Sequence, residues 1–442
     1  MRAAYVLAVG LSGCLIDNPA WLGPPAEATG SGTGTGGSSS SGSETGDEPA
    51  LGCPPRPASA AAVSVGPEQI GQLAQIVADA EPGSTIELRD GVYDLASIAP
   101  LRIEVAGVVL RSASADPSAV VFDGGASAMP LIEVRAPDVV LAEFTVRGGT
   151  QGGIMAVASA SFDPDRLTVY RMDLIDVGGH AVRGASNGDP DAYADGGEVV
   201  CSRFLRQTPL AGQACTELSA LRVFRGADWV FRDNEVQGYW CDDDDGEPPR
   251  TVSMLEGTRG SVIVRNRFQD CARAVVLGEA PSGVERRWAD NPCAVSDQWG
   301  HVEGLVANNM LWVGDPGVRP DSMISVWNVC DDRIFHNSIV MLGDGFHGIE
   351  HRFERTRATI VNNLTNADIQ MRDGSEAIVE GNLIEAGLDE FVDPFAGDLH
   401  LVPGSVAIGA ALANLGDLEL GPDFEGDPRD DAPDVGADEY RP

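Results

Sequence analysis

The hydrophobic positions of this chain recur in one short pattern: an apolar residue, two further positions, Asn, one position, and a second apolar residue. The first clear copy runs from Phe231 through Asn234 to Val236. The other copies contain Ile263, Asn266 and Phe268; Val306, Asn309 and Leu311; Ile334, Asn337 and Ile339; and Val379, Asn382 and Ile384. Ile360 and Asn363 fit with Thr365 in the last place, and Tyr170, Asp173 and Ile175 fit with Asp replacing Asn. Such an internal repeat predicts a solenoid in which each copy belongs to one coil.

The repeated asparagines predict corners between short strands. Asn tolerates left-handed backbone angles and forms local side-chain hydrogen bonds in turns. We expect the flanking apolar residues to point into the core and the asparagines of successive coils to hydrogen-bond along the axis, as in ladders of stacked strands. The intervals between them are 32, 43, 28, 26 and 19 residues, so the longer coils would carry inserted loops.

The segments between the corners are rich in β-branched and aromatic residues, which favour strands. They are 221–224, 252–255, 274–277, 323–327 and 348–353. Segment 67–80 has helical spacing instead, with Ile70, Leu73, Ile76 and Val77 on one face. Because an open solenoid end exposes unpaired strand edges, we expect this helix to cover the first coil and the acidic, Pro-rich tail 421–442 to cover the last.

Both ends of the repeat region carry motifs that resemble those of pectin-lyase-like proteins. The N-terminal motif is Ala80-Glu-Pro-Gly-Ser-Thr-Ile-Glu-Leu88 followed by Gly91-Val-Tyr93. The C-terminal motifs are Phe391-Val-Asp-Pro, Gly397-Asp-Leu-His-Leu, Pro403-Gly-Ser, Asp427-Pro-Arg and Asp434-Val-Gly-Ala-Asp-Glu-Tyr440, and they resemble the end of many bacterial surface β-helix proteins. The resemblance implies an all-β fold, a single-stranded right-handed parallel β-helix with a short N-terminal helical cap. The family includes polysaccharide lyases, glycoside hydrolases, epimerases and members of no known activity, so the fold alone does not give the function.

The N-terminus predicts export and a lipid anchor. Arg2 precedes a short apolar stretch, and Leu11-Ser-Gly-Cys14 resembles a bacterial lipobox in which Cys14 carries the lipid. The alternative is an ordinary cleaved signal peptide with a chance Cys. Segment 29–46 is nearly pure Gly, Ser and Thr and therefore predicts a flexible tether. We expect a signal peptide over 1–13, a tether over 14–61, a β-helix domain over 62–442, and a monomeric outer-membrane lipoprotein facing the cell surface or periplasm.

The eight cysteines are compatible with disulfides in an exported protein. Without Cys14 seven remain, and Cys53 at the end of the tether is the one we expect to be unpaired. The six between 201 and 330 would form three bridges, whose pairing the spacing leaves open. No Cys-x-x-Cys pair and no His/Cys cluster has zinc-ligand spacing, so we expect no zinc site.

The charge of the chain excludes some partners and one catalytic base. Acidic residues number 67 against 30 basic ones, for a formal net charge of −37. Such a surface repels nucleic acid phosphates, so we expect no nucleic acid partner. Every basic residue is Arg. The resemblance implies that one lyase family of this fold uses Lys as its base, and that mechanism is excluded here.

Candidate catalytic residues lie on the predicted strands between corners and on the turns that end them. Glu256 and Glu279 end successive predicted strands, and coil spacing of about 4.8 Å would bring the two carboxylates close enough for glycoside hydrolysis. Arg352 with His351 could serve a lyase, since other lyases of this fold use Arg with Ca²⁺, or His and Tyr. Surface decoration is the alternative for each of these residues, because outward side chains must be polar.

The densest acidic run, Cys241-Asp-Asp-Asp-Asp-Gly246-Glu, suggests a Ca²⁺ site at Asp243 and Asp245, because hard oxygen ligands suit this ion. A solvated acidic loop is the alternative, since the spacing does not match an EF-hand.

Two functions remain open at this point. One is a surface-anchored protein that binds or cleaves an extracellular polysaccharide, aided by Ca²⁺ if the glycan is anionic. The other is a non-catalytic envelope or adhesion solenoid. A groove in which aromatic and Arg side chains converge on a carboxylate pair would favour the first.

Overall fold

The computed structural model describes residues 53–57, 62–127, 129–186, 189, 191–207, 214–241, 247–290, 292–293, 296–343, 345–413 and 421–442. All of them lie within the compact unit Glu48–Pro442. The predicted lipid site Cys14, most of the tether, and the Ca²⁺ candidates Asp243 and Asp245 lie outside the described residues.

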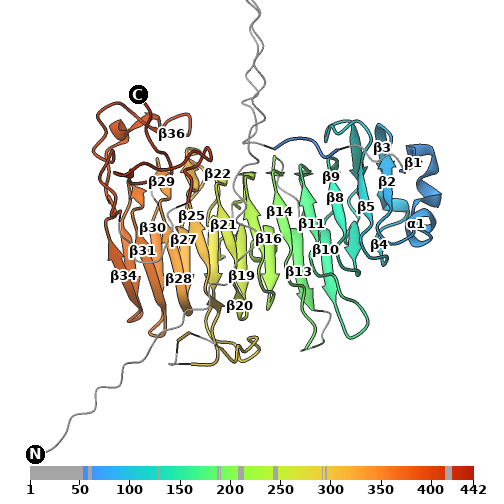
Figure 1. The fold of residues 1–442 in the computed structure, drawn as a ribbon, viewed down its shortest axis with the longest axis horizontal. Helices are drawn as coiled ribbons and strands as arrows, with labels where there is room; N and C mark the ends of the chain where they lie inside the picture. The colour runs from blue at the N-terminus through green and yellow to red at the C-terminus, as the bar shows by residue number, and fades with distance from the viewer. Residues whose placement is uncertain are drawn as a thin grey trace, which may run out of the picture. The chain divides into compact units, whose positions relative to one another are not determined.

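The described part is a right-handed parallel β-helix built from three long parallel sheets, as the sequence predicted (Figure 1). Most coils contribute one strand to each of the sheets, which we call A, B and C, and sheet A also contains the additional short strands β20 and β24. Sheet A contains β1 Val63–Val65, β2 Thr85–Leu88, β5 Val109–Ser112, β8 Val140–Ala142, β11 Thr168–Tyr170, β14 Glu198–Val200, β17 Val230–Arg232, β20 Thr258–Arg259, β21 Val262–Val264, β24 His301–Val302, β25 Leu305–Ala307, β28 Val329–Phe335, β31 Arg357–Val361 and β34 Glu376–Glu380.

Sheets B and C run beside sheet A with the same coil order. Sheet B contains β3 Gly91–Asp94, β6 Val120–Asp123, β9 Thr145–Arg147, β12 Asp173–Ile175, β15 Arg203–Leu205, β18 Glu235–Gln237, β22 Arg267–Gln269, β26 Met310–Val313, β29 Ser338–Met341 and β32 Leu364–Thr365. Sheet C contains β4 Leu101–Ile103, β7 Ile132–Val134, β10 Gly152–Ala158, β13 His180–Ser186, β16 Ser219–Phe224, β19 Val252–Leu255, β23 Val275–Gly278, β27 Ser322–Trp327, β30 His347–Arg352 and β33 Ile369–Arg372.

The remaining elements are short. They are the α-helix α1 Ile70–Ala78, the 3-10 helices η1 Pro67–Gln69, η2 Leu95–Ser97, η3 Cys215–Glu217 and η4 Leu388–Glu390, and the antiparallel pair β35 Phe391–Asp393 and β36 Asp398–Leu401. Among the described residues, none of the helices has the length and apolar character needed to cross a membrane.

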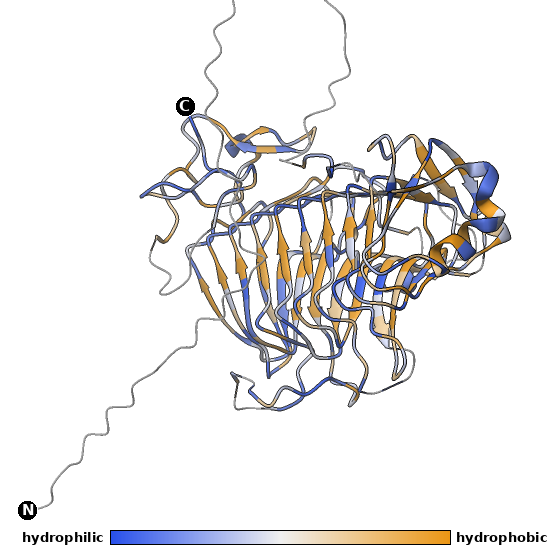
Figure 2. Ribbon diagram, turned by 45° about the vertical axis from the view of Figure 1, so that its right-hand side comes forward, coloured by the Kyte–Doolittle hydropathy of each residue, from blue (hydrophilic) through white to orange (hydrophobic). Residues whose placement is uncertain are grey.

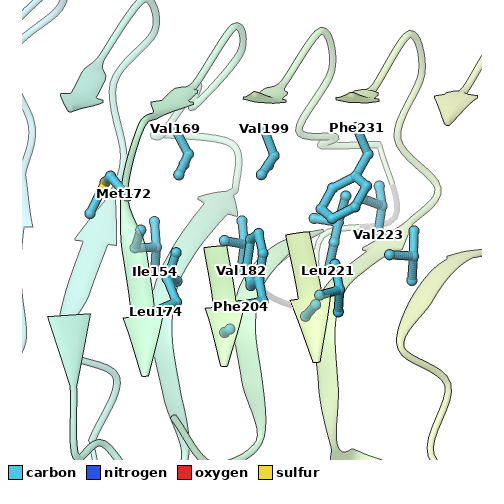
Figure 3. Close-up of a cluster of buried hydrophobic side chains, with 14 of the residues drawn as sticks. Ile154, Val169, Met172, Leu174, Val182, Val199, Phe204, Leu221, Val223 and Phe231 are labelled. Atoms are coloured by element: carbon cyan, nitrogen blue, oxygen red, sulfur yellow. The ribbon is translucent and has the colours of Figure 1, made fainter. Parts of the chain in front are cut away.

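The core runs along the inside of the solenoid as rows of aligned apolar side chains. Successive strand residues point to opposite faces, so one apolar set from every strand turns inward. Ile154, Val182 and Leu221 are partners in the register of sheet C and are fully buried. Figure 3 shows them facing a second row that contains Val199 and Phe231. Figure 2 shows apolar residues along the strands of the solenoid. Full burial of a Val, Leu, Ile, Phe or Met side chain stabilises the fold by about 1.5–3 kcal/mol.

The predicted Asn ladder is present at the corner between sheets A and B. The side-chain Nδ2 of Asn234 donates to Oδ1 of Asn266 over 3.0 Å, and Asn266 donates in the same way to Asn309. The ladder continues through Asn337, Asn363 and Asn382 over 2.9 Å at each step. Each Oδ1 also accepts the backbone N–H of the preceding Asn. The ladder therefore fixes where neighbouring coils turn.

The left-handed backbone at this corner belongs to the residue before each ladder Asn. Asp233, Arg265 and Asn308 have φ values of 56°, 52° and 54°. The tolerance of Asn for left-handed angles, one reason for predicting corners at these residues, is therefore not what the ladder Asn contributes. Asn suits the ladder position because its side-chain amide both donates and accepts hydrogen bonds between coils. The residue before it adopts the left-handed backbone of the turn.

The two predicted caps behave differently. Helix α1 covers the first coil, with Leu73 and Val77 fully buried in the core. The tail instead lies on the outer face of sheet B, where the Ala437 N–H donates to Ser338 Oγ over 2.9 Å. The segment after β35 lies on the same face, where its Pro394 carbonyl accepts the Trp312 indole N–H over 2.7 Å. The expectation that 421–442 covers the last coil was wrong, because an apolar cluster of Met310, Val340, Phe391, Leu399 and Phe424 draws the tail sideways.

The cysteine pairing also differs from expectation. Cys53 pairs with Cys201, Cys215 with Cys241, and Cys293 with Cys330, and the buried Cys271 is free. Cys53 was expected to be unpaired because it follows the low-complexity segment. Neighbouring residues are nevertheless packed against the domain, since the Arg56 N–H donates to Glu143 Oε1 over 2.6 Å. Packing of residues 53–57 therefore begins before the predicted domain boundary at 62.

Asn309→Leu is expected to destabilise the protein by about 2–5 kcal/mol, because it removes ladder bonds on both sides and leaves buried partners unsatisfied. Asn382→Leu is the matched control, since Asn382 is only partly buried and ends the ladder. Denaturant unfolding measures both variants. Equal losses of unfolding free energy, or no loss for Asn309→Leu, would contradict the ladder's role.

Candidate functional site

The outer face of sheet C carries two rows of side chains that combine charge with aromatic surface. One row follows the register Arg183, Arg222, Ser253, Val276, Ser325 and Glu350. The other contains Phe224, Leu255, Trp327, Arg352 and Arg372. Leu255, Val276 and Trp327 pack together there, with Phe224 and Phe353 against them. We call this surface, from β13 to β33, the C-face strip.

A pocket of about 200 Å³ lies in the C-face strip. Its lining includes four guanidinium groups, four carboxylates and one indole, from Arg250, Arg273, Arg352, Arg372, Glu247, Glu279, Asp321, Glu350 and Trp327. The Arg250 and Arg273 guanidiniums lie 5.5 and 4.8 Å from the Trp327 ring centroid. Such cation–π contacts hold the indole in a fixed orientation.

Carboxylates offset most of the positive charge in this pocket. The Trp327 indole N–H donates to Glu350 Oε1 over 2.7 Å, and Arg372 Nη1 donates to Glu350 Oε2 over 2.6 Å. Arg273 pairs with Asp321. The pocket is therefore polar and of mixed charge, with an aromatic floor.

Glu256 and Glu279 occupy equivalent corners of adjacent coils, as the sequence predicted. Glu256 follows β19 and Glu279 follows β23, and these strands pair in parallel register. Arg225 Nε lies 3.5 Å from Glu256 Oε2, and Arg250 Nη1 lies 3.5 Å from Glu279 Oε2. The two carboxylates thus lie at neighbouring positions on one edge of the C-face strip, and Glu279 also lines the pocket.

Burial shifts the acidity of both carboxyl groups in the same direction. Burial raises the pKa of Glu256, and the charge of Glu279 raises it further. Burial also raises the pKa of Glu279, against the opposing charge of Arg250. A carboxyl group with a raised pKa holds its proton at higher pH and can donate it, which is what a general acid requires.

A loop after β23 covers the Glu256 corner. The Arg286 N–H donates to the Glu256 carbonyl over 2.9 Å, and the Trp288 indole N–H donates to the Gly257 carbonyl over 2.9 Å. The Cys293–Cys330 disulfide ties the same loop to β28. This loop explains why Glu256 is largely withdrawn from solvent although it stands at a corner.

His351 and Arg352, predicted to act together, lie on opposite faces of β30. Arg352 points outward, lines the pocket and lies 5.0 Å from the Phe353 ring centroid. His351 pairs in register with the core residue Val326, is 4% exposed, and has Nδ1 2.9 Å from Ser375 Oγ. Burial lowers the pKa of His351. Their proposed cooperation on one face was wrong, because adjacent strand residues alternate.

Several residues of the C-face strip were not predicted from the sequence. Arg183 stacks on Phe224 at 5.2 Å, and within the described residues it makes no ion pair. With the strand register known, the alternation of inward and outward residues would have predicted that Arg183 and Trp327 point outward. Arg250 and Arg273 precede their strands, so no periodic signal marked them.

A buried group of Ser261, His301 and Asp332 has the geometry of a nucleophile with its base. His301 Nε2 lies 3.0 Å from Ser261 Oγ, and Nδ1 lies 2.9 Å from Asp332 Oδ1. All three residues are at most 1% exposed. A polymer substrate has no access to such a hydroxyl, and Asp332 also accepts the Gly304 N–H over 2.8 Å. The group therefore fixes the extra strands β20 and β24 against β28.

No protein-family model matches this chain, and no curated protein matches it. Solved structures that are similar include an alginate lyase from Paenibacillus sp. str. FPU-7, with 13% identity, a TM-score of 0.47, and coverage of 73% of this chain and 99% of that one. Pectate lyase Pel9A has 13% identity, a TM-score of 0.48, and coverage of 86% and 96%.

The A-module of the Azotobacter vinelandii mannuronan C-5 epimerase AlgE6 has 13% identity, a TM-score of 0.42, and coverage of 72% of this chain and 94% of that one. At 13% sequence identity, the activities of these three proteins are not transferred to this chain. The parallel pairing of successive coils in this chain is given by the register of its own strands.

Glu256→Gln is expected to raise the melting temperature at pH 7.5 and to leave it unchanged below pH 4.5. The carboxyl pKa is raised above its ordinary value of 4.5 in the folded state, so ionisation opposes folding once the pH exceeds that value. Below it the group is protonated in both states and contributes nothing. Thermal melts of both proteins across this range provide the measurement, and a less stable variant at pH 7.5 would contradict the assignment.

Proposed function

We propose that this chain binds an extracellular polysaccharide along the C-face strip and hydrolyses it at Glu256 and Glu279. The observation that carries the proposal is the junction of an aromatic and guanidinium surface with two half-buried carboxyl groups on adjacent coils. Aromatic faces offer apolar contact area for sugar rings, and guanidinium groups bind carboxylates through paired hydrogen bonds.

The length of the C-face strip supports a polymeric ligand. Its rows pass through β13, β16, β19, β23, β27, β30 and β33. At about 4.8 Å between strands, these seven strands span roughly 29 Å. Arg183 lies near one end and Arg372 at the other, so charged contacts are available over a distance that exceeds a single sugar.

The proposed chemistry assigns separate roles to the two carboxyl groups. One donates its proton to the glycosidic oxygen as the bond from that oxygen to the sugar carbon breaks, and the other, as a carboxylate, attacks this carbon. A water molecule then hydrolyses the glycosyl–enzyme bond and gives its proton to the first carboxylate. The coil spacing of about 4.8 Å is nearer to the separation in retaining glycosidases, about 5–5.5 Å, than to that in inverting enzymes. A lyase mechanism through His351 is not proposed, because this imidazole faces the core.

A non-catalytic binding or adhesion protein is the second candidate. The observation that favours it is the pairing of the pocket arginines with carboxylates, namely Arg273 with Asp321, Arg372 with Glu350, and Arg352 with Asp373. In these pairs the carboxylates accept hydrogen bonds from guanidinium groups that, in a catalytic site, would bind the substrate. Binding without product formation would identify this function.

The proposed function is tested by measuring binding and release of reducing ends with a panel of uronic acid polymers and neutral glucans. Each polymer is tested with and without Ca²⁺. Arg183→Ala and Arg352→Ala are expected to weaken binding about tenfold or more, the usual cost of losing a charged hydrogen bond. Arg102→Ala is the control, since Arg102 is exposed at the other end of sheet C.

Glu279→Gln in the same panel should abolish release of reducing ends and preserve binding. Absence of binding to every polysaccharide, or equal binding by all four variants, would overturn the proposal. The Ca²⁺ arm also tests the acidic loop: if Asp243 and Asp245 hold this ion, Asp243→Asn should remove any Ca²⁺ dependence.

We further propose that the protein is a lipid-anchored outer-membrane protein, on the strength of the Leu11-Ser-Gly-Cys14 motif and the Gly/Ser/Thr-rich segment after it. Cys14→Ser is expected to move the protein from the membrane fraction to the soluble fraction, because the lipid attachment atom is lost. Fractionation followed by immunoblotting measures this, and an unchanged membrane fraction would contradict the anchor.

A further inference from the structure

The C-terminal tail and the β35–β36 hairpin bring together three potential metal ligands. His400 lies on β36, while Glu425 and Asp438 lie in the tail. One donor atom from each residue lies within 4.8 Å of the other two. The residues are widely separated in sequence, so only folding of the tail onto sheet B assembles the group, which we call the tail cluster.

The imidazole of His400 is held by carboxylates on both sides. Its Nδ1 lies 2.5 Å from Asp398 Oδ1, and its Nε2 lies 2.6 Å from Glu425 Oε1. Metal-binding histidines usually donate one ring N–H to a carboxylate and present the other nitrogen to the ion. Asp398 occupies the first position here, which leaves Nε2 directed at Glu425.

Asp438 is the most buried member of the tail cluster. It is 7% exposed, and its Oδ2 accepts the Leu401 N–H over 2.7 Å. Within the described residues its other oxygen accepts no hydrogen bond, although the carboxylate stands beside His400 and Glu425. Burying a carboxylate with one hydrogen bond is costly unless a cation offsets its charge.

The positive groups beside these carboxylates are the His400 imidazole, when protonated, and the side chain of Arg429. Asp423 and Asp434 are also buried in the tail. The Arg429 side chain is buried as well, but its Nη1 pairs with Glu439 Oε2 over 3.1 Å and its Nη2 donates to the Gly436 carbonyl and to Asn308 Oδ1. The tail cluster therefore has three carboxylates, including Asp398, around a single imidazole.

We propose that His400, Glu425 and Asp438 form a divalent transition-metal site, for which Zn²⁺ is the natural probe. One imidazole nitrogen and two carboxylate oxygens suit Zn²⁺, whereas Ca²⁺ prefers oxygen ligands alone. Zn–N and Zn–O distances of about 2.0–2.2 Å need only small movements from the present arrangement. The side chains of His400 and Glu425 are 39% and 34% exposed, which leaves room for a water ligand.

This site differs from the expectation drawn from the sequence, which considered cysteine and histidine spacing only. Its ligands have no local motif, and two of them are carboxylates. The ion would join β36 to two parts of the tail and would thereby hold the tail against sheet B. It is distant in sequence from Glu256 and Glu279 and does not depend on the proposed function.

The test uses the full chain without a histidine tag, from which bound metal has been removed with EDTA. Binding of Zn²⁺ is measured by calorimetry at pH 8, where protons compete less for the imidazole than at lower pH. One equivalent is expected to bind and to raise the melting temperature. His400→Gln and Glu425→Gln should abolish this binding. Asp398→Asn should weaken it about 10–100-fold, the usual effect of losing the carboxylate behind a metal-bound histidine.

His347→Gln is the matched control, because His347 Nδ1 also lies 2.8 Å from a carboxylate, that of Asp368, outside the tail cluster. This variant should bind Zn²⁺ as the unmodified chain does. Circular dichroism confirms that each variant is folded, and Glu425→Gln alters a partly exposed side chain. Absence of saturable Zn²⁺ binding, or binding retained by folded His400→Gln, would overturn the proposal and leave His400 as a protonated bridge between Asp398 and Glu425.

Discussion

The hydrogen bonds between stacked asparagine side chains are the constraint on which the other features of this solenoid depend. Between the two ends of the ladder, each Asn amide donates to the next coil and to a backbone carbonyl, while its oxygen accepts both the side chain and the backbone N–H of the preceding Asn. These bonds are buried, so an unsatisfied partner would cost about 1–3 kcal/mol. The coils from Asn234 to Asn382 must therefore turn at the same place, which keeps the strands on either side of this corner aligned.

A fixed corner allows the rest of each coil to vary. Intervals between ladder asparagines range from 19 to 43 residues, yet the ladder geometry does not change across them. The additional residues form loops, and the loop after β23 covers Glu256 and is tied to β28 by a disulfide. The C-face strip thus combines a rigid sheet with variable loops, the arrangement in which binding sites usually occur.

The recurrence of apolar residues and Asn predicted the fold because it reflects local physics repeated in every coil. The same register predicted that Glu256 and Glu279 occupy neighbouring coils. The face on which His351 lies was missed, because alternation within β30 requires knowing which residue points inward. The tail, the Cys53–Cys201 bridge and the tail cluster depend on contacts between segments far apart in sequence, and no periodic pattern records them.

Hydrogen exchange of the backbone amides of Asn234, Asn266, Asn309, Asn337 and Asn363 tests the central claim most directly, since each N–H donates to the next ladder side chain. If the ladder holds the coils together, these amides exchange only when the whole solenoid unfolds, with protection equal to the global unfolding free energy. Exchange of the ladder amides as fast as that of surface loops would contradict this account.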